Sequence, residues 1–368
     1  MLTYTTPGGD LLTSTPTDNT QILSGEIITA LLLQLNERVE VVNLVNAPQL
    51  THYDINLLNI ADYNENRLKR VIKQLEALTH YQIAFTRSYI AHFGLDIIKA
   101  NKSPLNLKTG LETASYNTAT RSTAALGKDT AGNNVLLDIA TAPHLLIGGT
   151  TGSGKSVLLN SIIISLLYKA TPRTTGFIMI DPKQVEMAAY RRLPMLERPI
   201  ATTTETAIDT LKWACDEMAR RYKYLERHHL KSIENTHLKR LYIIIDELAD
   251  LMLTSKKQVE QYIVRIAQLG RACGVHLIVA TQRPSVNVVT GLIKANIPTK
   301  VCLTVASPTD SMTILSHGGG EKLTGRGDAI LKRGDSTQET RFQAYYTPET
   351  DIEAVNKYIY KQYPFWAR

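Results

Sequence analysis

One stretch of the chain contains glycines, a lysine and a hydroxyl in the order that a phosphate-binding loop requires. Gly149 and Gly154 are followed at once by Lys155 and Ser156, which fits the pattern G-x-x-x-x-G-K-[ST]. Glycine lets the backbone turn tightly and bring its N–H groups against phosphate oxygens. We expect ATP to bind here, with Lys155 on the β- and γ-phosphates and Ser156 on Mg²⁺. The candidate nucleotide-binding residues are Gly149, Thr150, Thr151, Gly152, Ser153, Gly154, Lys155, Ser156 and Val157.

The segments on either side of this loop support the interpretation. Residues 145–148 are apolar or small, as in a buried strand, and residues 157–167 are apolar on nearly every face, as in a buried helix. The N-terminal end of such a helix is positive and favours phosphate. A tight turn without a ligand is the alternative, but a tight turn does not require the Lys-Ser pair.

Two neighbouring acids, Asp246 and Glu247, follow the apolar segment 241–245. In a parallel sheet, ligands bind at the carboxyl ends of the strands. We expect Asp246 to hold Mg²⁺ and Glu247 to orient and deprotonate the water that attacks the γ-phosphate. An Asp-Glu pair that only begins a helix is the alternative, and the phosphate loop favours ATP hydrolysis.

Two further apolar segments end in polar residues. Gln282 follows residues 275–280 and is expected to sense the γ-phosphate. Asp181 follows residues 177–180 in the same way. A capping or turn role is the alternative for either residue, and the Pro182 that follows Asp181 suits a turn there.

From His144 onward, short β-branched segments alternate with helical ones. This pattern indicates an α/β fold with a mostly parallel sheet covered on both faces. A hairpin over residues 126–138 is expected to precede it. The candidate strands are residues 145–147, 177–180, 241–245, 275–280, 301–305 and 328–331.

The preceding residues are predicted to form three parts. Residues 1–20 are rich in Thr, Pro, Gly and Asp, which favours a flexible or loosely docked arm. Residues 21–110 are predicted to form a small α+β domain, and residues 111–125 a linker to a domain at 126–368. Within the small domain we expect helices at 26–35 and 64–79 and strands at 51–57, 81–85 and 89–98.

The composition is that of a globular protein, and the formal net charge is +7. Such a charge suits a polyanionic partner such as nucleic acid but does not require one. Cys215, Cys273 and Cys302 lie far apart, which favours a reducing compartment over a zinc or disulfide framework. Because we find neither a long apolar run nor a signal peptide, we expect a soluble, cytoplasmic protein with no membrane segment.

Several longer stretches resemble the motor region of the FtsK/SpoIIIE family of double-stranded DNA translocases. Their order and spacing separate this family from other phosphate-loop ATPases. The resemblance implies a RecA-like P-loop ATPase that uses ATP and Mg²⁺ and acts as a homo-hexameric ring around double-stranded DNA. The matching stretches are residues 126–129, 143–156, 177–183, 213–222, 246–252, 280–285 and 291–299.

The resemblance also assigns residues outside the phosphate loop. Arg271 matches the arginine that reaches the γ-phosphate bound by the neighbouring subunit, where it stabilises charge in the transition state. An arginine tied to a nearby acid is the alternative. Arg283 and Lys294 match positions that face the DNA backbone, and charges there suit tracking that does not depend on sequence.

The chain departs from the family pattern at a second DNA loop. Pro308 and Met312 stand where basic residues are usual, which predicts a weaker grip on DNA. Lys300, Lys322 and Arg326 are candidates to compensate. We expect no counterpart of the family's winged-helix and membrane-spanning regions, and therefore a free-standing motor of a kind that suits a phage, plasmid or other mobile element.

The leading expectation is ATP-driven transport of duplex DNA. One alternative is a motor for single-stranded DNA, either a conjugative coupling protein or a helicase. A second alternative is a nucleotide-switched assembly ATPase, which hydrolyses ATP slowly and ignores DNA. Met312 keeps this second alternative open.

Overall fold

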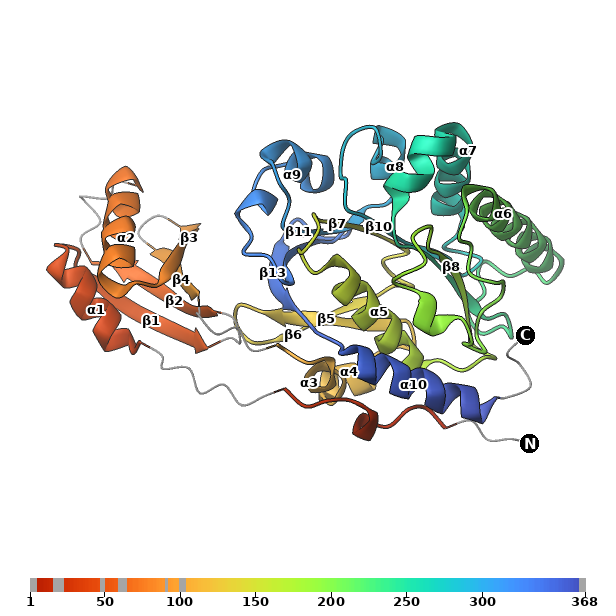
Figure 1. Cartoon of the computed structure of the whole chain (residues 1–368), viewed down its shortest axis with the longest axis horizontal. Coiled ribbons are helices and arrows are strands. Elements are labelled where there is room, and N and C mark those ends of the chain that lie inside the picture. Colours follow the sequence, from red (N-terminus) through yellow and green to blue (C-terminus); the bar gives the residue numbers. More distant parts are fainter. Residues whose placement is uncertain are drawn as a thin grey trace. The chain divides into compact units, whose positions relative to one another are not determined.

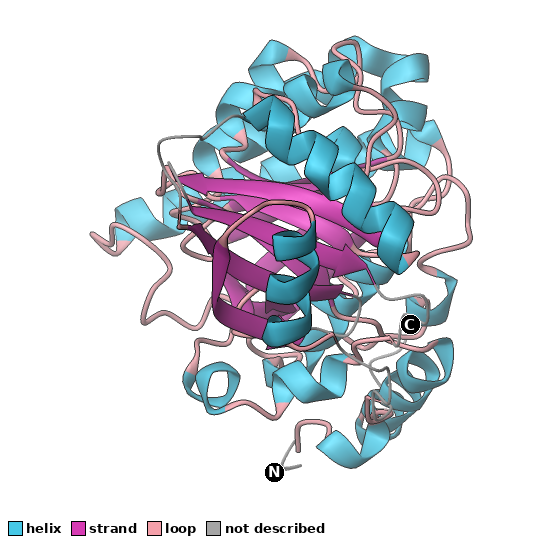
Figure 2. Cartoon of the chain, turned by 90° about the vertical axis from the view of Figure 1, so that its left-hand side faces the viewer, coloured by secondary structure: helices cyan, strands magenta, loops and turns pink. Residues whose placement is uncertain are grey.

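The computed structural model describes residues 5–15, 23–46, 50–58, 65–89, 92–98 and 104–363. These residues form two compact units (Figure 1). Among the described residues, the larger unit contains residues 5–13, 106–127 and 134–363, and the smaller unit contains the rest. Figure 2 distinguishes their helices from their strands by colour.

The smaller unit is an α+β fold with a four-stranded antiparallel sheet in the order β1-β2-β4-β3. Along β2, alternate side chains such as Tyr53 and Ile55 are buried in one core with Ile28 and Leu75 of the two helices. The sequence predicted all of these elements except β1. The predicted bounds of α1, α2 and β2 lie within one residue of those observed, whereas β3 ends four residues later and β4 begins three residues later than predicted. The elements are α1 (Gly25–Gln34), β1 (Val39–Asn46), β2 (Leu50–Leu57), α2 (Glu65–Thr79), β3 (Gln82–Tyr89) and β4 (His92–Ile98).

The larger unit is built on a nine-stranded sheet in the order β6-β5-β13-β12-β11-β7-β10-β9-β8. Its central strands β11, β7 and β10 are buried along their whole length, because helices and neighbouring segments cover them. The strands are β5 (Thr123–Asp129), β6 (Asn134–Asp138), β7 (His144–Gly148), β8 (Thr175–Ile180), β9 (Arg240–Ile245), β10 (Val275–Thr281), β11 (Thr299–Leu303), β12 (Asp328–Lys332) and β13 (Glu339–Ala344).

Only part of this sheet is parallel. The five strands β11-β7-β10-β9-β8 run parallel to their neighbours, as predicted. Strand β12 is antiparallel to β11, and β13 is antiparallel to β12. The prediction of another parallel strand at 328–331 is therefore wrong, and β13 was not predicted. The α/β class itself is confirmed.

The helices of the larger unit place apolar faces on the sheet. For example, Leu211 of α6 and Ile263 of α7 share one core with Ile243 and Ile245 of β9, and α10 packs against α5. The helices are α3 (Leu107–Leu111), α4 (Ala114–Thr118), α5 (Lys155–Lys169), α6 (Thr204–Arg227), α7 (Leu248–Leu269), α8 (Gly291–Asn296), α9 (Pro308–Leu315) and α10 (Glu349–Gln362).

The predicted linker at 111–125 is instead part of the larger unit. This stretch contains α4 and the start of β5, and Leu111 and Tyr116 are buried. The Tyr116 hydroxyl donates a 2.5 Å hydrogen bond to the Ser165 carbonyl of α5. Its polar composition suggested a linker, but its few apolar side chains are the ones that pack.

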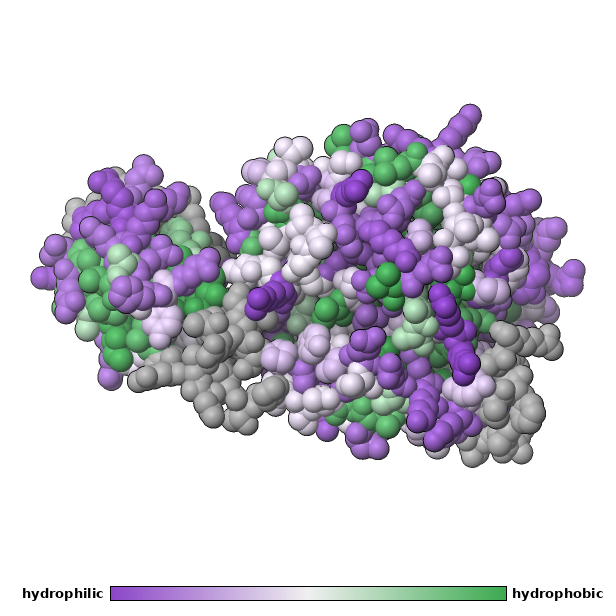
Figure 3. Space-filling view, viewed as in Figure 1, coloured by the Kyte–Doolittle hydropathy of each residue, from purple (hydrophilic) through white to green (hydrophobic). Residues whose placement is uncertain are grey.

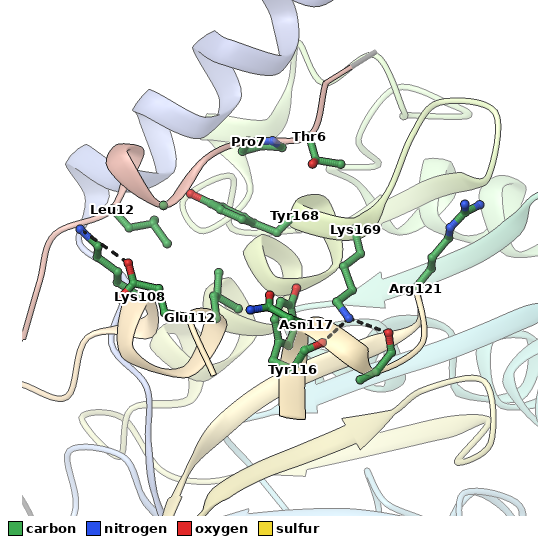
Figure 4. A pocket seen from close by; sticks show the side chains of 13 residues that line it. Thr6, Pro7, Leu12, Lys108, Glu112, Tyr116, Asn117, Arg121, Tyr168 and Lys169 are labelled. Atoms are coloured by element: carbon green, nitrogen blue, oxygen red, sulfur yellow. Dashed lines mark hydrogen bonds and ion pairs between the residues drawn. The ribbon is translucent and has the colours of Figure 1, made fainter. Parts of the chain in front are cut away.

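Of the two alternatives for the N-terminal arm, flexible or loosely docked, the flexible one is corrected, because residues 5–13 pack on the larger unit. The Thr13 N–H and hydroxyl both donate to the Asp351 carboxylate at 2.7 Å. The Tyr168 hydroxyl donates to the Gly8 carbonyl at 3.0 Å. A hollow of about 530 Å³ lies between this segment and α4. Figure 4 shows its lining side chains, among which Lys169 donates to two main-chain carbonyls. Residues 1–4 and 16–20 of the predicted arm lie outside the described residues.

Hydrophilic residues predominate on the face of the larger unit shown in Figure 3. Among the described helices, we find none both long and apolar enough to cross a membrane. Cys215, Cys273 and Cys302 are buried free thiols, and burial raises the pKa of each.

Candidate nucleotide site

The phosphate loop connects β7 to α5 and is anchored on both sides. Because β7 lies between β10 and β11, the loop meets the carboxyl ends of both neighbours. The Gly149 N–H donates to the Thr281 carbonyl at 3.2 Å, and the Thr150 N–H donates to the Thr304 carbonyl at 2.9 Å. Gly154 has φ of 100°, and a Cβ there would lie 2.7 Å from the Gly327 nitrogen. Glycine is therefore required at this position.

A second turn, Gly325-Arg326-Gly327, supports the loop from behind. The Gly327 N–H donates to the Ser153 carbonyl at 2.7 Å, and all three residues have positive φ. Arg341 holds the following residue, Asp328, by a two-pronged ion pair at 3.0 and 2.8 Å. Arg326, predicted as a compensating DNA contact, therefore lies in a turn that backs the phosphate loop. The Gly-x-Gly spacing was the available sequence signal for this turn.

Lys155 and Asp246 meet in the site as a buried ion pair. The Lys155 Nζ lies 2.6 Å from both the Asp246 Oδ1 and the Asp246 carbonyl oxygen, and each side chain is at most 2 % exposed. Taking an ammonium and a carboxylate out of water is costly unless they stay paired. Arriving phosphates would offer Lys155 a new partner and free Asp246 for a cation.

The oxygen atoms of the side chains beside the loop are suitable ligands for Mg²⁺. The Ser156 hydroxyl donates to Glu186 at 2.6 Å, so hydroxyl and carboxylate oxygens gather beside the loop, and Mg²⁺ prefers oxygen ligands. Within the described residues there is no cluster of three or more His, Cys, Asp and Glu side chains that could hold a metal by itself. Phosphate and water oxygens would have to complete the shell, as is usual for this ion. The sequence analysis did not identify Glu186.

Glu247 is 1 % exposed and held from several directions. Its Oε1 accepts hydrogen bonds from the Thr281 hydroxyl at 2.7 Å and from the Ala249 N–H at 3.2 Å, which caps α7. Its Oε2 accepts from the Gln282 N–H at 3.0 Å and lies 3.7 Å from the Lys183 Nζ. The carboxylate is therefore fixed at the edge where β9 and β10 end. A fixed base needs little reorganisation before proton transfer.

Gln282 links the end of β10 to the phosphate loop. Its Oε1 accepts a hydrogen bond from the Thr151 hydroxyl at 3.0 Å. The next residue, Arg283, is exposed, and its N–H donates to the Thr281 hydroxyl at 3.1 Å. The structure thus brings Gln282 and Glu247 together with the loop, as the sequence predicted.

Asp181 organises a turn. Its Oδ1 and Oδ2 accept hydrogen bonds from the N–H groups of Gln184 and Met187, each at 3.0 Å. The side chain is buried and both oxygens are occupied. Of the two interpretations of Asp181, the structural one is favoured by these contacts.

Arg271 lies at the amino ends of the parallel strands, opposite the carboxyl ends where the phosphate loop lies. It precedes β10, whose seven residues separate it by about 20 Å from the phosphate-loop edge. The residue is exposed and borders a hollow of about 680 Å³ with Arg121 and Arg240. Within the described part of the chain we find no carboxylate bonded to Arg271. It is therefore too far away to reach the nucleotide of its own subunit.

Lys294 and Met312 lie together beside the sheet. The Lys294 Nζ donates to the Met312 carbonyl at 2.8 Å, which ties α8 to α9. Burial and the nearby charge of Lys332 lower the pKa of Lys294. Met312 is 51 % exposed, so an apolar side chain stands at the second predicted DNA loop.

Comparison with known proteins agrees with these observations. A profile of the FtsK/SpoIIIE family matches residues 107–240 and 234–286. The DNA translocase FtsK of Caldanaerobacter subterraneus subsp. tengcongensis is 45 % identical over 278 residues, covering 73 % of this chain and 39 % of that protein. The DNA translocase SftA of Bacillus subtilis is 37 % identical over 352 residues, covering 92 % of this chain and 37 % of that protein. The chain thus spans about two fifths of the length of these relatives.

Among solved structures, the chain is similar to the pCW3 conjugation coupling protein TcpA, in a monomer form with ATPγS. The TM-score is 0.65 at 25 % sequence identity, over 90 % of this chain and 97 % of that one.

Proposed function

Because the chain belongs to the FtsK/SpoIIIE family, we propose that it hydrolyses ATP to move double-stranded DNA through a ring of six copies. The names of the two relatives support DNA translocation. The phosphate loop with Lys155, Asp246 and Glu247 supports ATP hydrolysis. The net charge of +7 suits a DNA partner.

In the proposed reaction, Lys155 leaves Asp246 and binds the β- and γ-phosphates. Ser156 and Asp246 would hold Mg²⁺, and the ion would supply charge neutralisation at the phosphates. Glu247 takes a proton from the attacking water, and the Thr281 hydroxyl and the Gln282 N–H keep its carboxylate in place. Gln282 senses the γ-phosphate through its contact with Thr151.

The position of Arg271 is the observation that best supports an assembly in which neighbouring copies share nucleotide sites. A phosphate loop at one edge of the sheet and an exposed arginine at the other cannot meet within one chain. A neighbouring copy whose phosphate loop faces Arg271 would complete the site. The same head-to-tail contact, repeated with a rotation that closes, gives a ring. Arg271 would then stabilise transition-state charge on the neighbour's nucleotide.

Arg283 and Lys294 are proposed to contact the DNA backbone inside the ring. Arg283 is exposed one residue after Gln282, so a DNA contact there is directly coupled to the nucleotide site. Phosphate contacts carry no sequence information, which suits a motor that moves along any duplex.

The test is ATPase activity with and without DNA, in the wild type and in Lys155→Ala. We expect duplex DNA to raise the rate of ATP hydrolysis, and Lys155→Ala to abolish nucleotide binding. Displacement of a triplex-forming strand would report movement along the duplex. Electron microscopy with DNA and ATPγS would show whether a duplex threads a six-membered ring. A rate that is equal with and without duplex, together with the absence of rings, would refute the proposal.

A motor for single-stranded DNA is the second candidate, and the similarity to a conjugation coupling protein favours it. Stimulation of the ATPase by single strands alone would support this candidate over ours. Slow hydrolysis that ignores all DNA would instead identify a nucleotide-switched assembly ATPase.

A further inference from the structure

Three lysines gather beside α9, away from the phosphate loop. Lys300 of β11 and Lys332 of β12 are directly opposite each other in the antiparallel pair. Lys294 of α8 joins them, since its charge and that of Lys332 both act on Lys300. Like charges directly opposite each other destabilise a sheet. The arrangement therefore favours an anion that offsets them.

Two of these lysines donate hydrogen bonds to main-chain carbonyls of α9. The Lys294 Nζ donates to the Met312 carbonyl at 2.8 Å, and the Lys332 Nζ donates to the Leu315 carbonyl at 2.7 Å. Both carbonyls belong to the last turn of the helix, where partial negative charge accumulates. The helix end thus holds two of the three ammonium groups in place.

Lys300 has no such partner. The residue is 8 % exposed, yet within the described residues we find no hydrogen-bond acceptor for its ammonium. Burial and the charges of Lys294 and Lys332 lower the pKa of Lys300. Burying a charge without a partner is costly. Each lysine has three N–H donors, so Lys300 can offer all of its donors to a ligand.

The carboxylates of this surface do not balance the cluster. Glu339 of β13 lies opposite Lys332, and its Oε1 is 3.1 Å from the Lys332 Nζ. The same oxygen is 2.6 Å from the His317 Nε2. Among the described residues, this shared carboxylate is the one that forms an ion pair with these lysines, so the cluster keeps a net positive charge.

We propose that Lys294, Lys300 and Lys332 bind a phosphate group of the DNA backbone beside α9. The inference rests on the proposed DNA translocase function and adds a contact to it. The carbonyls of α9 position Lys294 and Lys332, and Lys300 supplies the free donors. Phosphate oxygens accept strong hydrogen bonds from several ammonium groups at once. The cluster thus provides a grip beside a helix whose own exposed side chain, Met312, is apolar.

The test compares the salt dependence of duplex binding in two double variants. Lys300→Gln with Lys332→Gln removes the cluster, and Lys212→Gln with Lys223→Gln removes two exposed charges from α6 as a matched control. Binding of a fluorescent duplex is measured by anisotropy with ATPγS over a series of salt concentrations. Losing one phosphate contact lowers the slope of log K against log salt by about 0.9. We expect this loss in the first variant and none in the control, with basal ATPase activity unchanged in both.

The outcomes separate this inference from the proposed function. If the wild type fails to bind duplex, the proposed function fails. If the wild type binds duplex but the cluster variant has the wild-type slope, the inference alone is overturned, and a lower melting temperature would then assign the lysines to helix capping. If calorimetry finds inorganic phosphate bound through the lysines while duplex binding is unchanged, the DNA assignment is also overturned. The single variants Lys332→Gln and Lys300→Arg test the DNA contact with smaller changes to the fold. Lys300→Arg keeps the positive charge and is expected to keep the wild-type slope of log K against log salt.

Discussion

Acid is expected to destabilise the larger unit through two buried histidines. His144 begins β7, the strand that leads into the phosphate loop, and His276 lies in the adjacent β10; each is 1 % exposed. Burial lowers the pKa of His144 to about 3 and that of His276 to about 4. The hydrogen bonds fit neutral rings, since the His144 Nδ1 accepts from the Leu277 N–H at 3.1 Å and the His276 Nδ1 donates to the Pro143 carbonyl at 3.0 Å.

The sign follows from proton uptake. In the unfolded chain both rings bind protons as the pH falls through about 6.5, whereas in the folded chain they stay neutral to about pH 4. The stabilising contribution is therefore complete above pH 6.5 and is lost as the pH falls. Between pH 8 and pH 5, each ring lowers the free energy of unfolding by about 2 kcal/mol, which gives about 4 kcal/mol for the pair.

Urea unfolding at pH 8 and pH 5, followed by tryptophan fluorescence, measures this loss. His276→Phe keeps an aromatic ring on Tyr242, on which His276 stacks at 5.6 Å between centroids. We expect this variant to lose about 2 kcal/mol less than the wild type between the two pH values. His229→Gln, at an exposed site, serves as the control and should match the wild type. An equal loss in His276→Phe and in the wild type would refute the reasoning.

Three further changes test the nucleotide site. Glu247→Gln is expected to bind ATP but to hydrolyse it about 10²- to 10⁴-fold more slowly, because the general base is lost. A wild-type rate of phosphate release in this variant would show that Glu247 is not the base. Arg271→Ala is expected to lower turnover by about 10³-fold or more. When the Arg271→Ala and Lys155→Ala proteins are mixed, some interfaces combine an intact phosphate loop from one copy with an intact Arg271 from the next, and ATPase activity should return there. Mixed rings without activity would argue against action between subunits. Gly154→Ala is expected to cost about 1–3 kcal/mol of stability and to weaken ATP binding, whereas Gly291→Ala, with open space around its Cβ, is the control in thermal unfolding.

Features that depend on neighbouring residues in the chain could be predicted from the sequence. The loop at 149–156 and the acids at 246–247 each follow one apolar strand. Carboxyl ends of parallel strands share an edge, so the sequence predicts that Lys155 lies near Asp246, and the two side chains are 2.6 Å apart. The roles of these residues in hydrolysis and DNA contact remain predictions.

Features that depend on how long connections fold could not be predicted. The middle of β12, residues 329–331, is apolar like the parallel strands, so its composition suggested another parallel strand. Its antiparallel direction is set by how residues 304–327 turn back. Glu186 and Gly327 reach the phosphate loop from segments with no periodic pattern, for the same reason.

The contacts at the end of β10 have a mechanical consequence under the proposed function. The Thr281 hydroxyl donates to Glu247 and accepts from the Arg283 N–H, and the Gln282 side chain meets Thr151. A displacement caused by loss of the γ-phosphate therefore reaches a DNA-facing cation through one or two peptide units, with no hinge or helix between them to absorb it. Such a short, stiff connection favours small displacements of Arg283, each tightly coupled to one hydrolysis event.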